Sequence, residues 1–377
     1  MTADGPTGTM RITGLSVFQL TLPLRKPYWL SGGRLKFEAL DSTIVRLDTD
    51  AGVTGWGEGC PWGATYLPAF GKGIRAGIEE IAPALLGLDP RRTDVVGRAM
   101  DTALPGHLYV KSAIDMACWD ILGKVAGLPL CDLLGGRAEG TVTLHSSIST
   151  GTPEEMVGHV AEARAKGYRI HSAKVGADVS QDIARIAALT DASPEGESLT
   201  FDVNRAWLPD QAIRVMNATA DPGAYFEQPC ETIEECIAVR RATRQPIILD
   251  ESIQAYQDLL RAWSARACEA IGLKVGRVGG LSKARRMRDF CVATGIRMNI
   301  EDTGGTVLAD TAAVHLAQAT PATHRRATWL CHDMIAVDLA PGAGARNRDG
   351  VTEAPDLPGI GVEPDMDVLG EPLANYG

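Results

Sequence analysis

Five short segments between residues 169 and 274 decide the fold: RIHSAK (169–174), LTFD (199–202), AYFE (224–227), IILD (247–250) and AIGLK (270–274). Each is a short apolar run that ends in a charged residue, and a helix-like stretch follows each one. The charged residues lie 28, 25, 23 and 24 positions apart. One strand–helix unit of a parallel sheet needs about 25–30 residues. The spacing therefore predicts one charged side chain at the carboxyl end of each of five consecutive strands.

These charged residues predict a metal site. In a β/α barrel the carboxyl ends of the strands meet at one mouth, where catalytic side chains gather. Asp202, Glu227 and Asp250 would repel one another there unless a cation lay among them. Their oxygens are hard ligands that suit Mg²⁺, and we expect one ion per subunit. Lys174 and Lys274, on predicted strands two and six, should flank the site from opposite sides.

Composition restricts the class of protein. The chain has 377 residues, 45% of them hydrophobic, and a net charge of −10, which disfavours nucleic acid and anionic membranes as partners. No run approaches 18 apolar residues, and the N-terminus lacks a basic region before an apolar core. We therefore expect neither a membrane span nor a secretory signal. The eight cysteines form no C-x-x-C pair, which favours reduced thiols in a cytoplasmic protein.

The first part of the chain predicts a separate domain. Residues 11–137 contain a strand over 11–24, a hairpin over 38–57 and helices near 74–86 and 109–126. Strands followed by helices indicate an α+β arrangement. The stretch from Tyr28 to Arg34, two aromatic residues and then a glycine pair, is expected to form a flexible loop over the barrel mouth.

From residue 138 to 340 the pattern becomes strand–helix alternation, which predicts a (β/α)7β barrel. Residues 341–377 are rich in Pro, Gly and Asp and should pack back on the first domain, while residues 1–10 are expected to be disordered. The fold class is thus α/β: a modified TIM-like barrel with an N-terminal capping domain that the C-terminal tail completes. The eight strands are expected near 141–149, 168–175, 198–203, 223–228, 245–250, 270–275, 296–301 and 327–331.

The chain resembles the enolase superfamily, in its mandelate racemase/muconate lactonizing enzyme group, from about residue 11 to 370. The resemblance is carried by SAIDMACWD (112–120), LLGG (133–136) and KVGRVGG (274–280). It implies a capping domain and a catalytic barrel, with Asp202, Glu227 and Asp250 as metal ligands and Lys274 as the sixth-strand lysine. Dimers or octamers are common in the family, so we expect a homo-oligomer.

One departure from the family pattern points to a branch. The muconate lactonizing group usually carries Lys-x-Lys on the second strand, whereas this chain reads Ser172-Ala173-Lys174. The pattern most resembles the branch that acts on proline derivatives. This implies Mg²⁺-dependent removal of the α-proton from a proline-type amino acid. The expected reaction is dehydration of cis-3-hydroxy-L-proline to Δ1-pyrroline-2-carboxylate, with some 2-epimerisation. The alternative is racemisation of proline betaine or of an N-substituted amino acid.

The two lysines suit this chemistry. A divalent cation that binds the substrate carboxylate stabilises an enediolate, and a lysine desolvated beside a cation can serve as the base. With Lys174 and Lys274 on opposite faces of the substrate, one removes the α-proton while the other returns a proton or protonates a leaving hydroxyl. In a cis-3-hydroxyproline the α-hydrogen and the hydroxyl lie on opposite ring faces. We expect Lys274 to face the α-proton of an L substrate.

Further residues are candidates for substrate contact. Asp302 could bind the substrate ammonium or cap a helix, and Tyr28, Tyr66 and Trp329 could close an aromatic box over the ring. Trp62 and Trp29 are alternatives for the same task. We expect Ser172, Asn204 and Glu251 to support the residues that contact the metal or the substrate, with Glu251 orienting Lys274. The rival functions are a sugar-acid dehydratase, disfavoured because an Asp–His pair is absent from strand six, and a barrel that only binds ligands.

Overall fold

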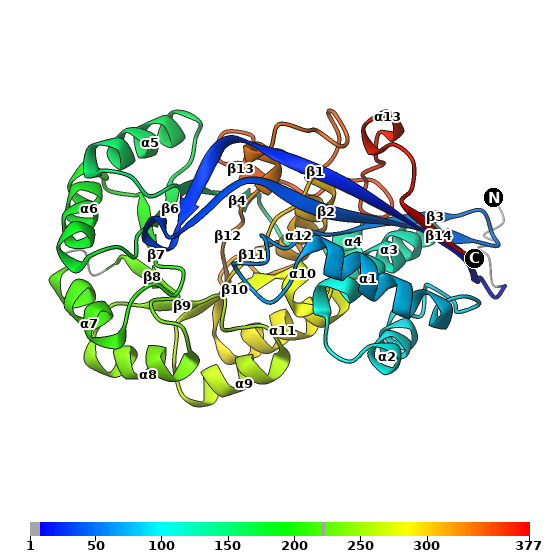
Figure 1. The fold of residues 1–377 in the computed structure, drawn as a ribbon, viewed down its shortest axis with the longest axis horizontal. Helices are drawn as coiled ribbons and strands as arrows, with labels where there is room; N and C mark the ends of the chain where they lie inside the picture. The colour runs from blue at the N-terminus through cyan, green and yellow to red at the C-terminus, as the bar shows by residue number, and fades with distance from the viewer. Residues whose placement is uncertain (1–7, 220–222) are drawn as a thin grey trace.

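Eight parallel strands form a ring, and helices surround it (Figure 1). The structure, a computed structural model, describes residues 8–219 and 223–377. Neighbouring strands are hydrogen-bonded in chain order, and a parallel bridge from Leu144 to Thr328 joins the two ends of the sheet. The expected barrel is therefore confirmed. Its strands are β5 (His145–Ile148), β6 (Ile170–Lys174), β7 (Ser198–Asp202), β8 (Tyr225–Glu227), β9 (Ile247–Leu249), β10 (Ala270–Lys274), β11 (Arg297–Glu301) and β12 (Arg325–Ala327).

Helices connect these strands and cover the outside of the ring. They are α5 (Pro153–Ala165), α6 (Val179–Ala192), α7 (Pro209–Ala218), α8 (Ile233–Ala242), α9 (Tyr256–Ser264), α10 (Val275–Val278), α11 (Leu281–Thr294) and α12 (Val307–Gln318). Local sequence fixes where several begin. The Thr152 hydroxyl accepts a hydrogen bond from the Glu155 amide, the Glu155 carboxylate accepts one from the Thr152 amide, and Pro153 occupies the first turn. A capping box of this kind satisfies two amides that the helix itself cannot pair.

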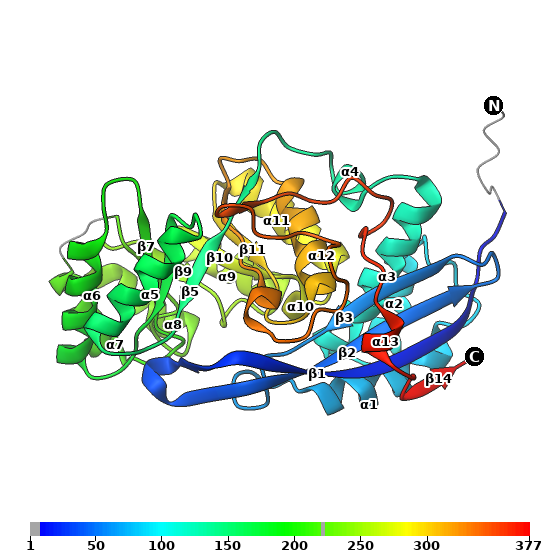
Figure 2. The same cartoon turned by 90° about the horizontal axis from the view of Figure 1, so that it is seen from above.

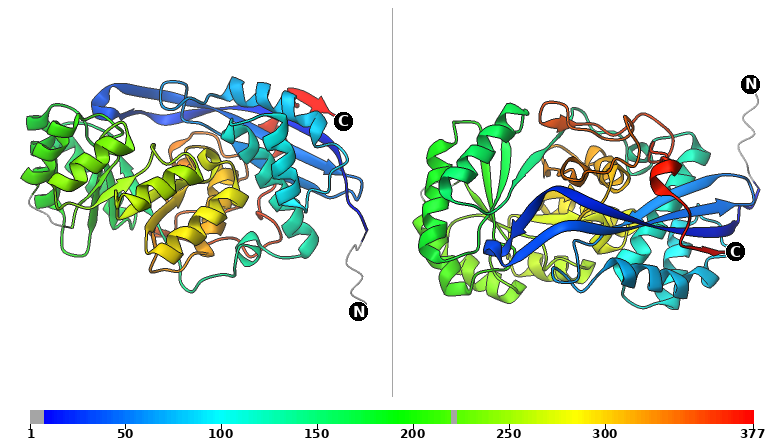
Figure 3. Two further views of the ribbon diagram at one scale, coloured as in Figure 1. Left: turned by 90° about the horizontal axis from the view of Figure 1, so that it is seen from below. Right: turned by 45° about the horizontal axis from the view of Figure 1, so that its top comes forward.

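A second sheet belongs to the capping domain, in the order β14-β1-β2-β3. Its strands are β1 (Ile12–Leu30), β2 (Leu35–Thr49), β3 (Thr54–Gly59) and β14 (Ala374–Tyr376), and its helices are α1 (Gly71–Ile81), α2 (Thr93–Ala103), α3 (Leu108–Ala126) and α4 (Leu130–Leu133). Because β14 pairs with β1, the C-terminal tail completes this sheet as expected. In Figures 2 and 3 the long β1–β2 ribbon, drawn in blue, extends from this sheet along the barrel.

The remaining elements are short. They are the 3₁₀ helices η1 (Ser31–Gly33), η2 (Ala82–Ala84) and η3 (Cys331–Met334), the paired strands β4 (Val142–Thr143) and β13 (Val351–Thr352), and α13 (Met366–Leu369). Across residues 8–219 and 223–377, no helix has the length and apolar character needed to cross a membrane.

The far end of the β1–β2 ribbon corrects one expectation. Residues 28–34 do not form a flexible loop: both strands continue to a tight turn, with Leu30 paired to Leu35. Ser31 and Gly32 have positive φ values of 52° and 63°, which close the turn. The Gly32 amide donates to the Val175 carbonyl at 3.0 Å, and the Ser31 hydroxyl donates to the Asn204 carbonyl at 2.8 Å. The ribbon is therefore anchored to the barrel rim.

Two further expectations were wrong in detail. The eighth strand ends at Ala327 instead of running over 327–331, and residues 331–334 form η3. Trp329 lies in the connection between them. At the N-terminus residues 1–7 lie outside the described residues, but the Met10 side chain is buried in the capping core and is not disordered. The proposed domain boundaries at 137 and 340 stay predictions.

A buried carboxylate joins the two domains. Glu58, on β3, accepts hydrogen bonds from the Thr306 amide at 2.9 Å, the Thr306 hydroxyl at 2.6 Å and the Ala309 amide at 3.2 Å. It also accepts one from the Ser42 hydroxyl at 2.6 Å. Thr306 precedes α12, so Glu58 pairs amides that the first turn of this helix leaves free. The capping sheet is thereby held against the loop that follows β11.

Candidate active site

A pocket lies at the carboxyl ends of the barrel strands, between the barrel and the capping domain. It brings together nine of the predicted site residues: Lys174, Lys274, Asp202, Glu227, Ser172, Asn204, Tyr28, Tyr66 and Trp329. Six further residues complete its lining, namely Leu30, Trp62, His145, Ser147, Glu301 and Thr303. Three predicted residues, Asp250, Glu251 and Asp302, lie behind this lining. The charged strand ends found in the sequence therefore do converge on one cavity.

The three predicted metal ligands lie on adjacent strands. Asp202 on β7 pairs in register with Glu227 on β8, and Asp250 follows β9 directly. Their exposures are 3%, 3% and 1%, so all three carboxylates are removed from water. Two have cationic partners: Asp202 forms an ion pair with Lys174, and Asp250 accepts a hydrogen bond from Arg277 Nη2 at 2.6 Å. Among the described residues, no three acidic, histidine or cysteine side chains are grouped as a metal site would require.

Glu227 has a different environment from the other two acids. Within residues 8–219 and 223–377, no hydrogen bond or ion pair joins its carboxylate to another side chain. Burial raises the pKa of Glu227 well above its usual range, and the charges of Asp202 and Asp250 raise it further. The charges of Lys274 and Lys174 offset this only in part, and a buried carboxylate without a directly paired cation is costly. The donor set therefore fits a divalent cation chemically: it offers three hard oxygens on adjacent strands, and one of them, on Glu227, has no directly bonded cation within the described residues.

The two lysines lie on β6 and β10, on opposite sides of the ring. Lys274 donates to Glu301 Oε1 at 2.7 Å and lies 3.8 Å from Asp250 Oδ2. Burial lowers the pKa of Lys274, but the carboxylates of Asp250, Glu301 and Glu227 outweigh it and raise that pKa above its usual value. For Lys174, burial likewise lowers the pKa and the Asp202 carboxylate more than compensates. Both side chains enter the pocket, as predicted.

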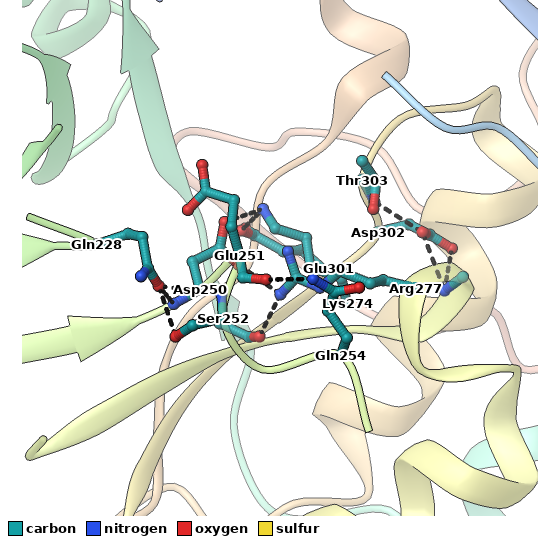
Figure 4. A network of polar contacts seen from close by, with 12 residues as sticks. Gln228, Asp250, Glu251, Ser252, Gln254, Lys274, Arg277, Glu301, Asp302 and Thr303 are labelled. Atoms are coloured by element: carbon teal, nitrogen blue, oxygen red, sulfur yellow. Dashed lines mark hydrogen bonds and ion pairs between the residues drawn. The ribbon is translucent and has the colours of Figure 1, made fainter. Parts of the chain in front are cut away.

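Glu301 is the main partner of Lys274, and its role was not predicted (Figure 4). Its second oxygen, Oε2, lies 2.8 Å from Nε2 of His145 on β5. Despite burial, the charge of Lys274 and the bond to His145 lower the pKa of Glu301. The sequence placed Glu301 at the end of the seventh strand. Its contact with the first strand required the ring to close, and no local pattern contained that information.

The expectation that Glu251 orients Lys274 was wrong. Glu251 Oε1 instead accepts a hydrogen bond from Asn204 Nδ2 at 3.0 Å. Burial raises the pKa of Glu251 to about 7, with the neighbouring Asp250 and Asp202 as further causes. Asn204 also donates from its amide to Asp202 Oδ1 at 3.0 Å. Asn204 and Glu251 therefore support Asp202, and Glu301 supports Lys274.

Asp302 is engaged by backbone amides. Its oxygens accept from the Gly276 amide at 3.0 and 3.1 Å and from the Thr303 amide at 2.7 Å. Burial raises its pKa to about 7. Because the carboxylate fixes the turn after β10 and does not line the pocket (Figure 4), the geometry gives no support to its expected contact with a substrate ammonium. Thr303 lines the pocket in its place and bonds Tyr109 at 2.7 Å.

Aromatic side chains cover the pocket. Trp62 lies at the centre of the group, with ring centroids 5.7 Å from Tyr28 and 5.9 Å from Trp329. Tyr66 lies near the acids and donates to Asp250 Oδ2 at 3.4 Å. Trp29, the other alternative, is 39% exposed and does not line the pocket. Tyr28, Tyr66 and Trp329 thus reach the cavity as expected, and Trp62 joins them.

Comparison with known proteins agrees with this architecture. The chain matches the family models "Mandelate racemase / muconate lactonizing enzyme, N-terminal domain" over residues 12–135 and "Enolase C-terminal domain-like" over residues 155–368. It is similar to cis-3-hydroxy-L-proline dehydratase of Roseibium aggregatum, 44% identical over 368 residues, which cover 97% of this chain and 100% of that protein. It is also similar to N-succinyl-L-Arg/Lys racemase of Bacillus cereus, 27% identical over 314 residues, covering 82% and 84% of the two chains.

A solved structure shows the same fold. It is a member of the enolase superfamily from Roseovarius nubinhibens ISM, complexed with magnesium. The two chains are 59% identical and superpose with a TM-score of 0.94, over 98% of this chain and 100% of that one. Together with the matched family models, these likenesses show that the chain belongs to the enolase superfamily, in its mandelate racemase/muconate lactonizing enzyme group.

Proposed function

We propose that this protein is a Mg²⁺-dependent hydro-lyase that removes water from cis-3-hydroxy-L-proline, with some 2-epimerisation. One observation carries the proposal: Lys174 and Lys274 enter a single buried pocket from opposite sides of the barrel, beside the carboxylates of adjacent strands. Two amines on opposite faces suit removal of an α-proton and departure of a hydroxyl on the other ring face. The 44% identity to a cis-3-hydroxy-L-proline dehydratase supports this choice of substrate.

Asp202, Glu227 and Asp250 would hold one Mg²⁺ per subunit. Three hard oxygens and the raised pKa of the buried Glu227, which has no directly bonded cation among the described residues, support this assignment, as does the relative that is complexed with magnesium. Bound there, Mg²⁺ would supply Lewis acidity, which stabilises the negative charge that develops on the substrate carboxylate.

The protein side chains then move two protons. Lys274 takes the α-proton of the L isomer at its Nζ, as a neutral amine. Burial favours that form, and a cation held by Asp202, Glu227 and Asp250 would offset the carboxylates that otherwise raise the pKa of Lys274. Glu301 holds the Nζ of Lys274 in place through the 2.7 Å contact. On the opposite face, the Lys174 ammonium gives a proton to the hydroxyl as the bond from C3 to oxygen breaks. Trp62, Trp329 and Tyr66 exclude water from the ring while this happens.

A racemase of an N-substituted amino acid is the second candidate. The 27% identity to an N-succinyl-L-Arg/Lys racemase supports it, because the same two lysines could pass a proton from one face of the α-carbon to the other. Such a substrate has no leaving group, so a racemase would release no water, and this difference distinguishes the two functions experimentally.

Incubation with cis-3-hydroxy-L-proline and Mg²⁺ in D₂O tests the proposal. We expect ultraviolet absorbance from Δ1-pyrroline-2-carboxylate and deuterium at the α-carbon of part of the recovered substrate. Lys274→Ala should lose both signals on the L isomer. An isomer without any loss of water would favour the racemase, and full exchange on the L isomer by Lys274→Ala would refute the assignment of the base.

We also propose a cytoplasmic location and a homo-oligomer. All eight cysteines are free thiols, which suits a reducing compartment. Helix α9 exposes Tyr256, Leu260 and Trp263 by 36%, 39% and 48% of their surfaces, and apolar side chains gathered in this way suit contact with another subunit. The expected assembly is a dimer or an octamer.

A further inference from the structure

We infer that Tyr28 and Ser147 form the subsite for the leaving hydroxyl, beside Lys174, and that this hydroxyl pair decides whether the substrate loses water or regains its α-proton. The inference rests on the proposed function and adds to it a specificity-determining contact. The ring hydroxyl of the substrate would then lie on the Lys174 side of the pocket, and this side would differ chemically from the Lys274 side.

The pair joins the two domains across the pocket. Tyr28 comes from β1, near the far end of the capping ribbon, and Ser147 comes from β5 of the barrel. The Tyr28 hydroxyl and the Ser147 hydroxyl are hydrogen-bonded to each other, and both side chains line the cavity. Tyr28 is 5% exposed, and its ring meets the edge of Trp62. Because the hairpin turn beyond Tyr28 is bonded to Val175 and Asn204 of the barrel rim, the phenol is fixed in place.

The pair belongs to the Lys174 side of the pocket. Ser147 pairs in register with Ser172, two residues before Lys174, on the neighbouring strand. The Lys174 ammonium lowers the pKa of Tyr28. Burial still raises that pKa above its usual value, so the phenol stays protonated and can donate.

On the opposite side of the pocket the hydroxyls are engaged elsewhere, since Tyr66 donates to Asp250 Oδ2 at 3.4 Å. Lys274 is bonded to Glu301, and Glu301 to His145, so this wall presents a cation, a carboxylate and an imidazole. The hydroxyl of Thr303 is already shared with Tyr109 at 2.7 Å. Among the described lining residues, the two hydroxyls that meet beside a lysine are therefore those of Tyr28 and Ser147.

The reaction step balances without a further reagent. Lys274 takes the α-proton, and the electron pair of that bond becomes the double bond between the α-carbon and C3. The bond from C3 to oxygen breaks with its electron pair on oxygen, Lys174 supplies the proton, and water leaves. The enamine that remains becomes Δ1-pyrroline-2-carboxylate when its ring nitrogen loses a proton and C3 gains one. Tyr28 and Ser147 hold this oxygen by hydrogen bonds as its charge increases. Without them the carbanion is reprotonated more often than it expels the hydroxyl.

The experiment measures a partition ratio. Full-length Tyr28→Phe and Ser147→Ala are incubated with Mg²⁺ and cis-3-hydroxy-L-proline in D₂O. For each variant, the rate of pyrroline formation is divided by the rate of deuterium uptake at the α-carbon of the remaining substrate. We expect this ratio to fall about tenfold or more in both variants, which is the effect of losing one hydrogen bond to a developing charge. A general loss of fit would lower both rates and leave the ratio unchanged.

Matched controls are available in the chain. Ser146 precedes Ser147 on β5, but its hydroxyl bonds His171 outside the pocket at 2.8 Å, so Ser146→Ala should keep the parent ratio. Tyr168 is a buried tyrosine that bonds Asp333 away from the pocket, and Tyr168→Phe should do the same. An unchanged ratio in either pocket variant, or an equal fall in the controls, overturns the inference. If the parent protein shows neither pyrroline nor exchange, the proposed function fails, and this inference fails with it.

Discussion

The contact between the two domains at Glu58 leads to a quantitative prediction. Glu58 is fully buried and accepts hydrogen bonds from Ser42, Thr306 and Ala309. Glu58→Ala leaves the two backbone amides of Thr306 and Ala309 without an acceptor, whereas the hydroxyls can rotate. Each unpaired buried amide costs about 1–3 kcal/mol, about 2–6 kcal/mol in total.

Part of this cost is offset. Burial raises the pKa of Glu58, so the parent protein already carries an unfavourable desolvation of the charge, and the alanine variant does not. We therefore expect a net loss of about 2–4 kcal/mol in the free energy of unfolding. With a urea m-value of about 3 kcal/mol per molar, the unfolding midpoint falls by about 0.7–1.3 M.

Urea unfolding followed by tryptophan fluorescence and by far-ultraviolet circular dichroism measures this change. Glu38→Ala is the matched control, because Glu38 is exposed on β2 and pairs with Lys36, and it should leave the midpoint unchanged. Thr303, which lines the pocket, lies three residues before Thr306, so KM should rise in Glu58→Ala as the loop moves. A midpoint within about 0.2 M of the parent value would refute the reasoning.

Three further predictions concern stability. Burial lowers the pKa of His315 to about 4, below an unfolded value near 6.5, so between these pH values the unfolded chain binds a proton that the folded chain does not. The free energy of unfolding should therefore fall by about 3 kcal/mol as the pH drops from about 6.5 to 4. In His315→Gln, the urea midpoint should not show this part of the pH dependence. Gly57→Ala should lose about 3 kcal/mol or more, because a Cβ there would lie 1.9 Å from the Ala113 carbonyl, whereas Gly97→Ala, with open space in α2, should gain about 0.5–1 kcal/mol in the same assay. In thermal melts at neutral pH, Glu227→Gln should melt higher than the parent in chelator, because the raised pKa of Glu227 costs the folded parent free energy. It should also lack the rise that Mg²⁺ gives the parent; a lower melting temperature in chelator would contradict this.

Much of the barrel could be predicted from the sequence because its signal is local. Each strand–helix unit buries one short apolar run and repeats after about 25 residues. The strand ends at Asp202, Glu227 and Asp250 could therefore be predicted without knowledge of any contact. The same periodicity placed Lys174 and Lys274 on opposite sides of the ring. Errors arose where the local signal changes: the aromatic and glycine residues at 28–34 suggested a loop, but backbone pairing between β1 and β2 continues through them.

The partners of these charged residues could not be predicted in the same way. Arg277 beside Asp250, and His145 beside Glu301, are contacts between strands or turns that no repeat encodes. Glu301 meets His145 because β5 and β12 close the ring, although the two residues are 156 positions apart.

The sequence by itself determined the barrel, its capping domain and the convergence of acids and lysines at one mouth, since a repeat of 25 residues needs no long-range information. Only the tertiary structure decided which carboxylate holds Lys274, which acid has no directly bonded cation and which hydroxyls meet in the pocket. These depend on ring closure and on the reach of the β1–β2 ribbon, and both are set by packing between segments far apart in the chain.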